Sequence, residues 1–279
     1  MTRLTALVLW SLLAGPAAAS EPAAWTTVTT PSTGKPEIIG RTAHGCIGGA
    51  VALPADGIGY QALRVGRRRN YGHPDTIALV QSLGRFAVAE KIGLLLVGDM
   101  GQPRGGPMPG GHASHQSGLD VDVWFRRTAA PLGPVEREQP LAVDMLLPNG
   151  KAVDPARFGA AEMALLHFAA TRPGVDRVLV NPAIKQALCL RVTGDRRWLR
   201  RVRPWWGHSM HFHVRLACPA GQPQCEEQAP PPPGDGCDRD LAWWFSADAL
   251  RALAERLKPR EPTPPKPLPA ACEAVLQAR

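Results

Sequence analysis

Two short stretches decide the architecture of this chain of 279 residues: GGHASHQSGLDVDVW at residues 110–124 and WWGHSMHFHVRL at residues 205–216. They contain five of the eight histidines, although a long segment of chain separates them. Each ends in an alternation of polar and apolar residues, which is typical of a β-strand that has one face in a core. We therefore expect two strands, over Leu119–Phe125 and His211–Leu216, whose polar faces meet.

Side chains two residues apart on a strand share a face and lie about 7 Å apart along it. The residues on the two predicted polar faces are Asp120, Asp122, Trp124, His211 and His213. If the strands are neighbours, carboxylates of the first strand meet imidazoles of the second. His115 lies in the loop before the first strand, and we expect it to reach the same place.

Two imidazoles and one carboxylate form a ligand set that suits Zn²⁺, and three protein ligands leave the fourth position open, as in catalytic zinc sites. Such an ion lowers the pKa of its water towards about 7 and polarises a carbonyl group, and a neutral imidazole beside it is suited to take a proton. Two alternatives stay open: histidines that only complete hydrogen bonds of the core, and a structural zinc site. A nucleophilic serine is disfavoured because the sequence has no G-x-S-x-G motif.

The first 19 residues predict export. A basic Arg3 precedes an apolar run over residues 4–14, and small residues follow at 17–19, which is the three-part pattern of a secretory signal cleaved before Ser20. A membrane anchor is the alternative, but the run is shorter than the ~20 residues that cross a bilayer. We expect no later transmembrane segment.

The composition is that of a globular protein, with 44% apolar and 20% charged residues. The formal net charge of +8 favours a nucleic acid, an acidic surface or an acidic polymer as partner and does not choose among them. Export and the lack of a basic–aromatic motif argue against nucleic acid.

Six cysteines, an even number in an exported chain, predict three disulfides, with free buried thiols as the alternative. They are Cys46, Cys189, Cys218, Cys225, Cys237 and Cys272. Spacing leaves the pairing open, although Cys218 and Cys225 flank a short Pro/Gly loop and are placed to close it locally.

We assign residues 20–258 to one catalytic domain and residues 259–279 to a Pro-rich tail that Cys272 ties back to it. The expected fold is α+β, with a central antiparallel sheet flanked by helices. The other expected elements are an extended arm over residues 20–45, a helix with Asp75 as its N-cap whose apolar stripe reaches Val88 and which stops at Gly93, a strand over Leu94–Val97, a helix over Arg157–Thr171, a strand over Arg177–Asn181, and a helix from its N-cap Ser246 to Leu257.

The two histidine-rich stretches resemble those of the penicillin-insensitive murein endopeptidases, which are zinc peptidases related to lysostaphin-type and D-Ala-D-Ala enzymes. The shared signature is a His, six residues, an Asp, and a later His-x-His, here His115, Asp122, His211 and His213. The similarity also covers Gly72-His73-Pro74, Gly98-Asp99-Met100-Gly101, Val180-Asn181-Pro182-Ala183-Ile184-Lys185, Arg203-Pro204-Trp205 and Gly234-Asp235-Gly236-Cys237.

This resemblance implies a zinc D-Ala-D-Ala peptidase/hedgehog-like fold and a periplasmic endopeptidase. Such enzymes cut the D-alanyl–meso-diaminopimelyl amide that cross-links the stem peptides of peptidoglycan, and penicillin does not block them because no serine is acylated. The disulfide pairs that the resemblance implies are Cys46–Cys272, Cys189–Cys237 and Cys218–Cys225.

The resemblance also implies roles for individual residues. His115, Asp122 and His213 hold the zinc, and His112 is a further metal-associated histidine. His211 acts as general base or stabilises the oxyanion, to which His208 also contributes. Apart from the resemblance, Trp205 and Trp206 directly precede the site and are expected to line the substrate, with core packing as the alternative, and Asp120 is expected to line it as well.

One departure from the family concerns a second metal ion. Some relatives have Asp-Gly-Lys-His where this chain has Asn149-Gly150-Lys151-Ala152, so that a carboxylate and an imidazole are missing. We therefore expect one catalytic Zn²⁺ and regard a second ion as doubtful. The alternatives for the function are a zinc D,D-carboxypeptidase and a non-catalytic wall-binding module with a zinc-stabilised site; the sequence does not indicate the oligomeric state.

Overall fold

The computed structural model describes residues 22–110, 112–258 and 266–278. The expected secretory signal over residues 1–19 lies outside the described residues, as does the part of the Pro-rich tail over 259–265. Within the described ranges, no helix combines the length and the apolar character that crossing a membrane requires.

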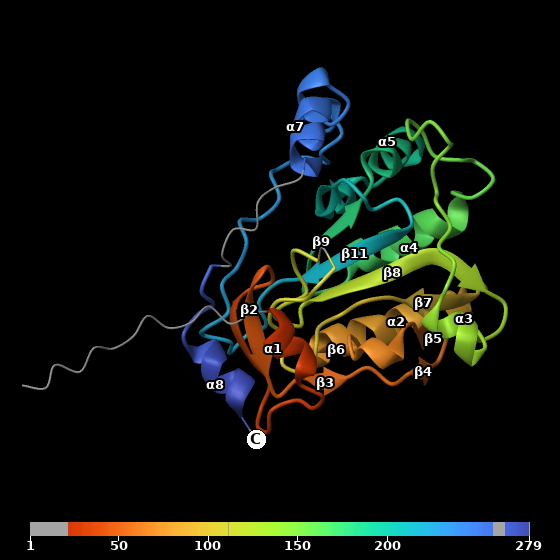
Figure 1. The fold of residues 1–279 in the computed structure, drawn as a ribbon. Coiled ribbons are helices and arrows are strands. Elements are labelled where there is room, and N and C mark those ends of the chain that lie inside the picture. Colours follow the sequence, from red (N-terminus) through yellow and green to blue (C-terminus); the bar gives the residue numbers. More distant parts are fainter. Residues whose placement is uncertain (1–21, 111, 259–265, 279) are drawn as a thin grey trace, which may run out of the picture.

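The centre of the molecule is a seven-stranded sheet with the strand order β10-β9-β11-β8-β7-β5-β4 (Figure 1). These strands are β4 (Asp56–Gly57), β5 (Tyr60–Ala62), β7 (Leu94–Val97), β8 (Asp120–Thr128), β9 (Val175–Val180), β10 (Val202–Pro204) and β11 (His211–Leu216). Two small two-stranded sheets pair β1 (Glu37–Arg41) with β2 (His44–Gly48) and β3 (Val51–Ala52) with β6 (Tyr71–Gly72).

The expected antiparallel arrangement holds for the central strands and for the edge pair β4–β5, but not for the whole sheet. β8 pairs antiparallel with β7 and β11, and β11 pairs antiparallel with β9. The pairs β5–β7 and β9–β10 are parallel. A helix connects the two strands of each parallel pair, α2 (Pro74–Ala89) in the first and α5 (Pro182–Arg191) in the second. A crossover of this kind is what parallel neighbours require, so the sheet is mixed.

The remaining helices are short. They are α1 (Pro22–Thr27), α3 (Pro134–Glu138), α4 (Ala160–Thr171), α6 (Arg239–Trp243), α7 (Ala247–Leu257) and α8 (Ala271–Gln277), with the 3₁₀ turns η1 (Val65–Arg67) and η2 (Arg197–Arg201). The expected cap of α7 is confirmed, because Ser246 Oγ accepts a hydrogen bond from the backbone N–H of Ala249.

The predicted helix over residues 75–93 exists as α2, but both of its ends differ. The N-cap is His73, whose Nδ1 accepts a hydrogen bond from the N–H of Asp75, and Asp75 itself lies in the first turn. The helix ends at Ala89, four residues before Gly93, and Val88 is 55% exposed rather than part of the apolar stripe. Pro at the first helical position explains the shifted start.

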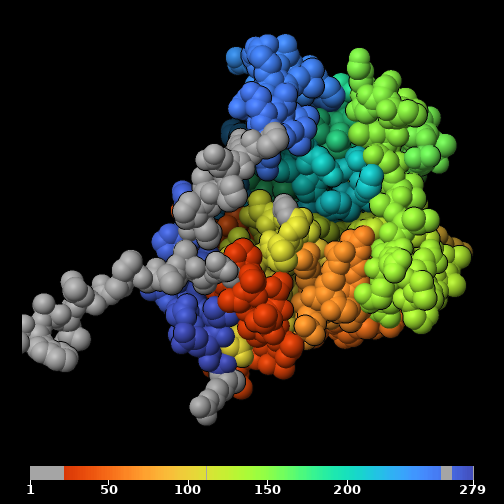
Figure 2. Space-filling view, viewed as in Figure 1, coloured from red at the N-terminus to blue at the C-terminus, as the bar shows by residue number. Residues whose placement is uncertain are grey.

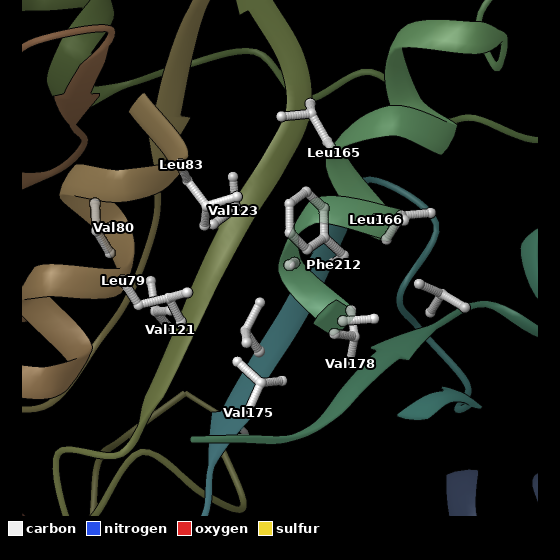
Figure 3. Packing of buried hydrophobic residues seen from close by; sticks show 14 of the residues in the cluster. Leu79, Val80, Leu83, Val121, Val123, Leu165, Leu166, Val175, Val178 and Phe212 are labelled. Atoms are coloured by element: carbon white, nitrogen blue, oxygen red, sulfur yellow. The ribbon is translucent and has the colours of Figure 1, made fainter. Parts of the chain in front are cut away.

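Helices α2 and α4 cover one face of the sheet, and the core lies between them and the strands. Val121 and Val123 of β8 and Phe212 of β11 point to this face and are fully buried, next to Leu83 of α2 and Leu165 of α4 (Figure 3). Since side chains alternate along a strand, Asp120, Asp122, His211 and His213 are left on the opposite face.

The N-terminal residues are more ordered than the expected extended arm. Residues 22–48 form α1 and the β1–β2 hairpin. Trp25 of α1 is 1% exposed and packs so closely on Gly106 that a Cβ on that glycine would lie 2.1 Å from the indole ring. Burial of this large apolar ring accounts for the helix, because the free energy gained exceeds the weak intrinsic tendency of a six-residue helix to form.

Three disulfides are present, with the pairing that the family resemblance implied. They are Cys46–Cys272, Cys189–Cys237 and Cys218–Cys225. The first spans a sequence separation of 226 residues and joins β2 to α8. The third closes the short loop whose local closure the spacing indicated.

Candidate metal centre

The centre is built on the antiparallel pairing of β8 with β11. The register places His213 opposite Asp122 and Arg215 opposite Asp120. Residues directly opposite each other in such a pair point to the same face of the sheet. The expected meeting of carboxylates and imidazoles therefore occurs, on the face that the helices leave uncovered.

The loop between β7 and β8 brings two further histidines to this face. His115 has a left-handed backbone, with φ of +69°, which is uncommon for a residue other than glycine. Its N–H donates to Asp120 Oδ2 at 2.9 Å, and the N–H of Gln116 donates to the carbonyl oxygen of Thr42 at 2.9 Å. These contacts hold the turn and direct the imidazole of His115 towards Asp122. In Figure 2 this loop (yellow) reaches the surface between the N-terminal segments (red) and the cyan part of the chain.

Three imidazoles meet at one oxygen, Asp122 Oδ1. His213 Nδ1 lies 3.0 Å from it, His115 Nε2 lies 3.5 Å from it, and His211 Nε2 lies 3.6 Å from it. His112, His115 and Asp122 each offer a ligand atom, and these three atoms lie within 4.8 Å of one another. His213 is not in that group of three, but it joins the centre through its contact with Asp122.

The donor atoms of this centre fit a metal ion of the zinc type, which takes nitrogen and oxygen ligands. Among the described residues, His115 Nδ1 is buried and has no hydrogen-bond partner. Its Nε2 is 3.5 Å from Asp122, which is longer than an ordinary N–H···O hydrogen bond. Buried polar atoms in proteins are nearly always paired, so the imidazole of His115 lacks a partner that a bound cation would provide.

Asp120 lies behind His213 rather than in contact with solvent. It is completely buried, so it offers no surface to a substrate, contrary to the expectation that it lines the substrate. Its Oδ1 lies 2.9 Å from His213 Nε2 and accepts a hydrogen bond of 2.8 Å from Arg215 Nε. A metal-binding histidine usually donates its second N–H to a carboxylate, which fixes the ring and its tautomer. Asp120 therefore orients His213 and leaves Nδ1 free to face Asp122.

The electrostatics of the centre favour charged carboxylates. Burial by itself would raise the pKa of Asp122, but the neighbouring His115 and His211 bring it well below its usual range. Burial likewise opposes ionisation of Asp120, and Arg215 and His213 more than offset it, so that its pKa is lowered. Burial would lower the pKa of His213, but the two carboxylates raise it to about 9. A cation that binds here therefore displaces a proton.

His112 is supported by a separate carboxylate. Its Nε2 lies 3.0 Å from Asp99 Oδ2, and the same oxygen accepts a 2.8 Å hydrogen bond from Arg69 Nη1. Burial would raise the pKa of Asp99, but the hydrogen bonds from His112 and Arg69 lower it to about 2. The charged carboxylate of Asp99 binds one ring nitrogen of His112. The other nitrogen is then free to act as a ligand together with His115 and Asp122.

His208 and His211 stand beside each other at the mouth of the centre, with ring centroids 4.9 Å apart. His208 Nδ1 lies 2.9 Å from the carbonyl oxygen of Trp206, and because a carbonyl only accepts, this nitrogen carries the proton. Burial and the nearby His211 lower the pKa of His208 to about 3, so its Nε2 is an acceptor. The expected contribution of His208 to stabilising an oxyanion stays a prediction.

The centre opens into a groove of about 780 Å³. All five histidines of the two sequence stretches line it, as do Trp205 and Trp206. Besides Asp122, its other charged or polar residues are Ser114, Gln228 and four arginines, Arg177, Arg203, Arg215 and Arg256. A groove with four guanidinium groups and one carboxylate suits a ligand that carries negative charge.

Known proteins of one family match almost the whole chain. The family model described as penicillin-insensitive murein endopeptidase matches residues 38–277. This chain belongs to that family. The protein of this name from Klebsiella pneumoniae subsp. pneumoniae is 44% identical over 272 residues, which are 98% of this chain and 97% of the relative. The one from Salmonella paratyphi B is 44% identical over 271 residues, or 97% of this chain and 96% of the relative. The family consists of peptidases, so the chain is a hydrolase of peptide bonds.

Sequence reasoning missed the groups that support the centre and part of the groove. Arg215 follows His211 and His213 in the same alternation, so the spacing already indicated that it faces the site. Asp99 gave a weaker signal, as an acidic residue two positions after a buried strand. Trp244, in the second Trp-Trp pair of the chain, gave no signal of proximity, because only the fold brings it to the groove.

Proposed function

We propose that this chain is a zinc-dependent D,D-endopeptidase of the periplasm that hydrolyses the D-alanyl–meso-diaminopimelyl bond between cross-linked stem peptides. The observation that carries the proposal is the meeting of three imidazoles at Asp122 Oδ1, all within 3.6 Å, at the base of an arginine-lined groove. Membership of the penicillin-insensitive murein endopeptidase family supports the choice of substrate.

In this proposal, His115, Asp122 and His213 hold one zinc ion, and His112 lies next to it. The unpartnered Nδ1 of His115 and the fixed ring of His213 support the assignment. A zinc ion bound there supplies Lewis acidity to the scissile carbonyl group and acidifies water. The Asn149-Gly150-Lys151-Ala152 turn, which lacks a carboxylate and an imidazole, supports a single ion.

His211 is the general base of the proposed reaction. Its side chain is 25% exposed, so one edge of the ring reaches the groove, and burial of the rest lowers its pKa and favours the neutral form. Its imidazole accepts the proton of the attacking water and passes a proton to the departing amine of diaminopimelate, so that the proton balance closes. His208 offers Nε2 as an acceptor to a substrate N–H.

The groove is proposed to hold the stem peptide. Its arginines complement the carboxylates that stem peptides carry, and Trp205 and Trp206 form a wall against the peptide. The same proposal assigns residues 20–258 to a peptidase domain with a zinc D-Ala-D-Ala peptidase/hedgehog-like fold, and residues 259–279 to a tail. The Cys46–Cys272 disulfide supports a tail that is held against the domain.

Hydrolysis of purified cross-linked muropeptide dimers, followed by chromatography and mass spectrometry, tests this function. We expect conversion of dimers to monomers without release of free D-alanine, loss of activity with a chelator, recovery with Zn²⁺, and no inhibition by penicillin. Free D-alanine as the product would instead identify a carboxypeptidase, and intact dimers with stable binding to sacculi would identify a wall-binding module.

His211→Ala separates catalysis from metal binding. We expect a fall in kcat of about 10²- to 10⁴-fold with metal content near that of the wild type, because a general base contributes rate rather than ligation. His167→Ala is the matched control, since His167 is an exposed histidine of α4 away from the groove. Metal loss in His211→Ala equal to that in His213→Ala would make His211 a ligand.

A further inference from the structure

Four of the eight tryptophans of the chain form a wall beside the groove. Trp205 and Trp206 precede β11, and Trp243 and Trp244 belong to α6 and its C-terminal cap. The ring centroids of Trp206 and Trp244 are 4.7 Å apart, and those of Trp243 and Trp244 are 5.3 Å apart. We call these four residues the tryptophan wall.

The tryptophan wall is not part of the core. Trp205 is 40% exposed and Trp243 is 43% exposed, and neither belongs to a buried cluster. Indole rings on a surface leave a large apolar face in water, which is unfavourable unless something covers it. In Figure 1, α7, which follows this wall in the chain, stands away from the sheet. Its Arg256 lies over Trp205, with the guanidinium carbon 5.6 Å from the ring centroid, but Trp243 stays 43% exposed.

The tryptophan wall has two sides. Trp205, Trp206 and Trp244 line the groove that contains the histidines. Trp243 and Trp244 line a second, shallower hollow of about 580 Å³. The other residues of that hollow are Arg203, Pro232, Arg239 and Asp240.

The hollow combines indole faces with hydrogen-bonding groups. Arg203 Nη2 and Asp240 Oδ2 are 3.4 Å apart, so this pair is loose and leaves donor and acceptor positions open. Asp240 is 51% exposed in its side chain, which keeps its oxygens accessible. A sugar ring has the complementary surface, because its C–H face is apolar and flat while hydroxyl and acetamide groups project from its rim.

We propose that the hollow on the outer side of the tryptophan wall binds the sugar chain of peptidoglycan next to the stem peptide that occupies the groove. This inference rests on the proposed function and adds a second recognition element to it. The stem peptide in the groove reaches only the inner side of the wall, and because it is made of alanine, acidic and diamino residues it has no ring or broad apolar face that would cover Trp243 on the outer side. The glycan to which it is covalently attached has such a face, and the shared residue Trp244 makes the two binding sites continuous.

Trp243 is the residue that tests this inference, because it lines the hollow and not the groove. The probe is peptide-free glycan strands, titrated against the full chain and followed by tryptophan fluorescence. We expect Trp243→Ala to weaken binding of the strands at least about fivefold, as loss of one aromatic contact would. Trp243→Phe keeps a ring and should restore most of the affinity, and Arg239→Gln should weaken binding through the polar half of the hollow.

The second measurement compares two substrates, a cross-linked peptide dimer without sugars and the same dimer with its disaccharides. Trp243→Ala should raise KM for the sugar-bearing dimer by a similar factor, with kcat unchanged, and should leave hydrolysis of the sugar-free dimer as in the wild type. Phe245→Ala is the matched control, since Phe245 follows Trp243 by two residues and is 40% exposed but does not line the hollow.

Equal losses on the two dimers would overturn the inference, because Trp243 would then contact the peptide. Glycan binding that is insensitive to both Trp243→Ala and Arg239→Gln would overturn it as well. Failure of the proposed function is a different result: the wild type would hydrolyse neither dimer, while binding of the strands would still depend on Trp243.

Discussion

The two faces of the β8–β11 pair are buried to a similar degree but differ in chemistry. Phe212 on the helix side is 0% exposed, and so is Asp120 on the groove side. Removing the phenyl ring from water is favourable in itself, whereas removing a carboxylate is unfavourable unless ions and hydrogen bonds replace the water. The helix side therefore needs only complementary shape, while the groove side needs every polar partner in place. Because every polar group on the groove side needs a partner, the positions and charges of these side chains are fixed. A metal site requires ligands that are fixed in this way.

The largest expected effect follows from removing His213 on the groove side. His213→Ala should lower hydrolysis of muropeptide dimers by about 10³-fold or more, because a metal ion contributes several kcal/mol to the barrier reduction. Metal content, measured by atomic absorption, should fall with it. The free energy of unfolding in urea should change far less than the activity, and wild-type turnover by this variant would contradict the assignment of His213 as a ligand.

Removing the neighbouring Phe212 should affect stability rather than metal binding. Phe212→Ala should lower the free energy of unfolding by about 3–5 kcal/mol, because it leaves a cavity between β11 and the helices that cover it. Urea unfolding measures this loss. At a temperature at which the variant is folded, its metal content should equal that of the wild type. A variant of full stability without metal would contradict the division of the two faces.

Arg215 tests whether the groove side depends on the polar partners of its buried carboxylates. Arg215→Gln removes the cation that offsets the burial of Asp120 and should weaken metal affinity about 10- to 100-fold, as is typical when a group that orients a ligand is lost. Competition with a chromophoric chelator measures the affinity independently of activity. Arg177→Gln is the control, because Arg177 also lines the groove but contacts Asp176 and the carbonyl oxygen of Ala229. Equal losses in the two variants would exclude a specific role for Arg215.

Lys185 is a buried amine that, unlike the buried residues on the groove side, is not paired with an oppositely charged side chain among the residues that the structure describes. Its titration gives the smallest of the expected effects, a change of stability with pH. It is 0% exposed and donates to the carbonyl oxygens of Leu199 and Asp235. Burial, together with the nearby Arg203, lowers its pKa from 10.5 to about 7. Between these two values the unfolded chain binds a proton that the folded chain has lost, so this residue makes the folded state more stable as the pH rises.

The test is the difference in free energy of unfolding between the wild type and Lys185→Met. The advantage of the wild type should be larger at pH 9 than at pH 6, by about 2 kcal/mol. Guanidinium unfolding at the two pH values measures it. An advantage that is the same at both would mean that Lys185 titrates in the folded chain as it does in the unfolded one.

Much of the fold could be predicted because it depends on local patterns. The strand over His211–Leu216 has the predicted ends, and the alternation in β8 and β11 places apolar and polar side chains on the expected faces. The cap at Ser246 depends on one side chain and its own backbone, so it too could be read from the sequence. These features need no knowledge of distant residues.

Features that depend on distant residues could not be predicted in the same way. The parallel pairs β5–β7 and β9–β10 follow from where α2 and α5 pack, and the helix α1 exists because Trp25 packs against Gly106. The burial of Asp120 depends on Arg215 and His213 together, so it changed the expected role of Asp120 from lining the substrate to orienting His213.

The sequence by itself determined which residue types the site contains, which of them share a strand face, and the family to which the chain belongs. The spacing of residues along a strand determines to which face each side chain points, whatever the strand packs against. Only the tertiary structure decided which nitrogen of each histidine is occupied, which carboxylate is buried, and which tryptophans stand together beside the groove. Those properties come from contacts between segments far apart in the chain, and the burial and charge of a side chain are set by these contacts rather than by its neighbours in sequence.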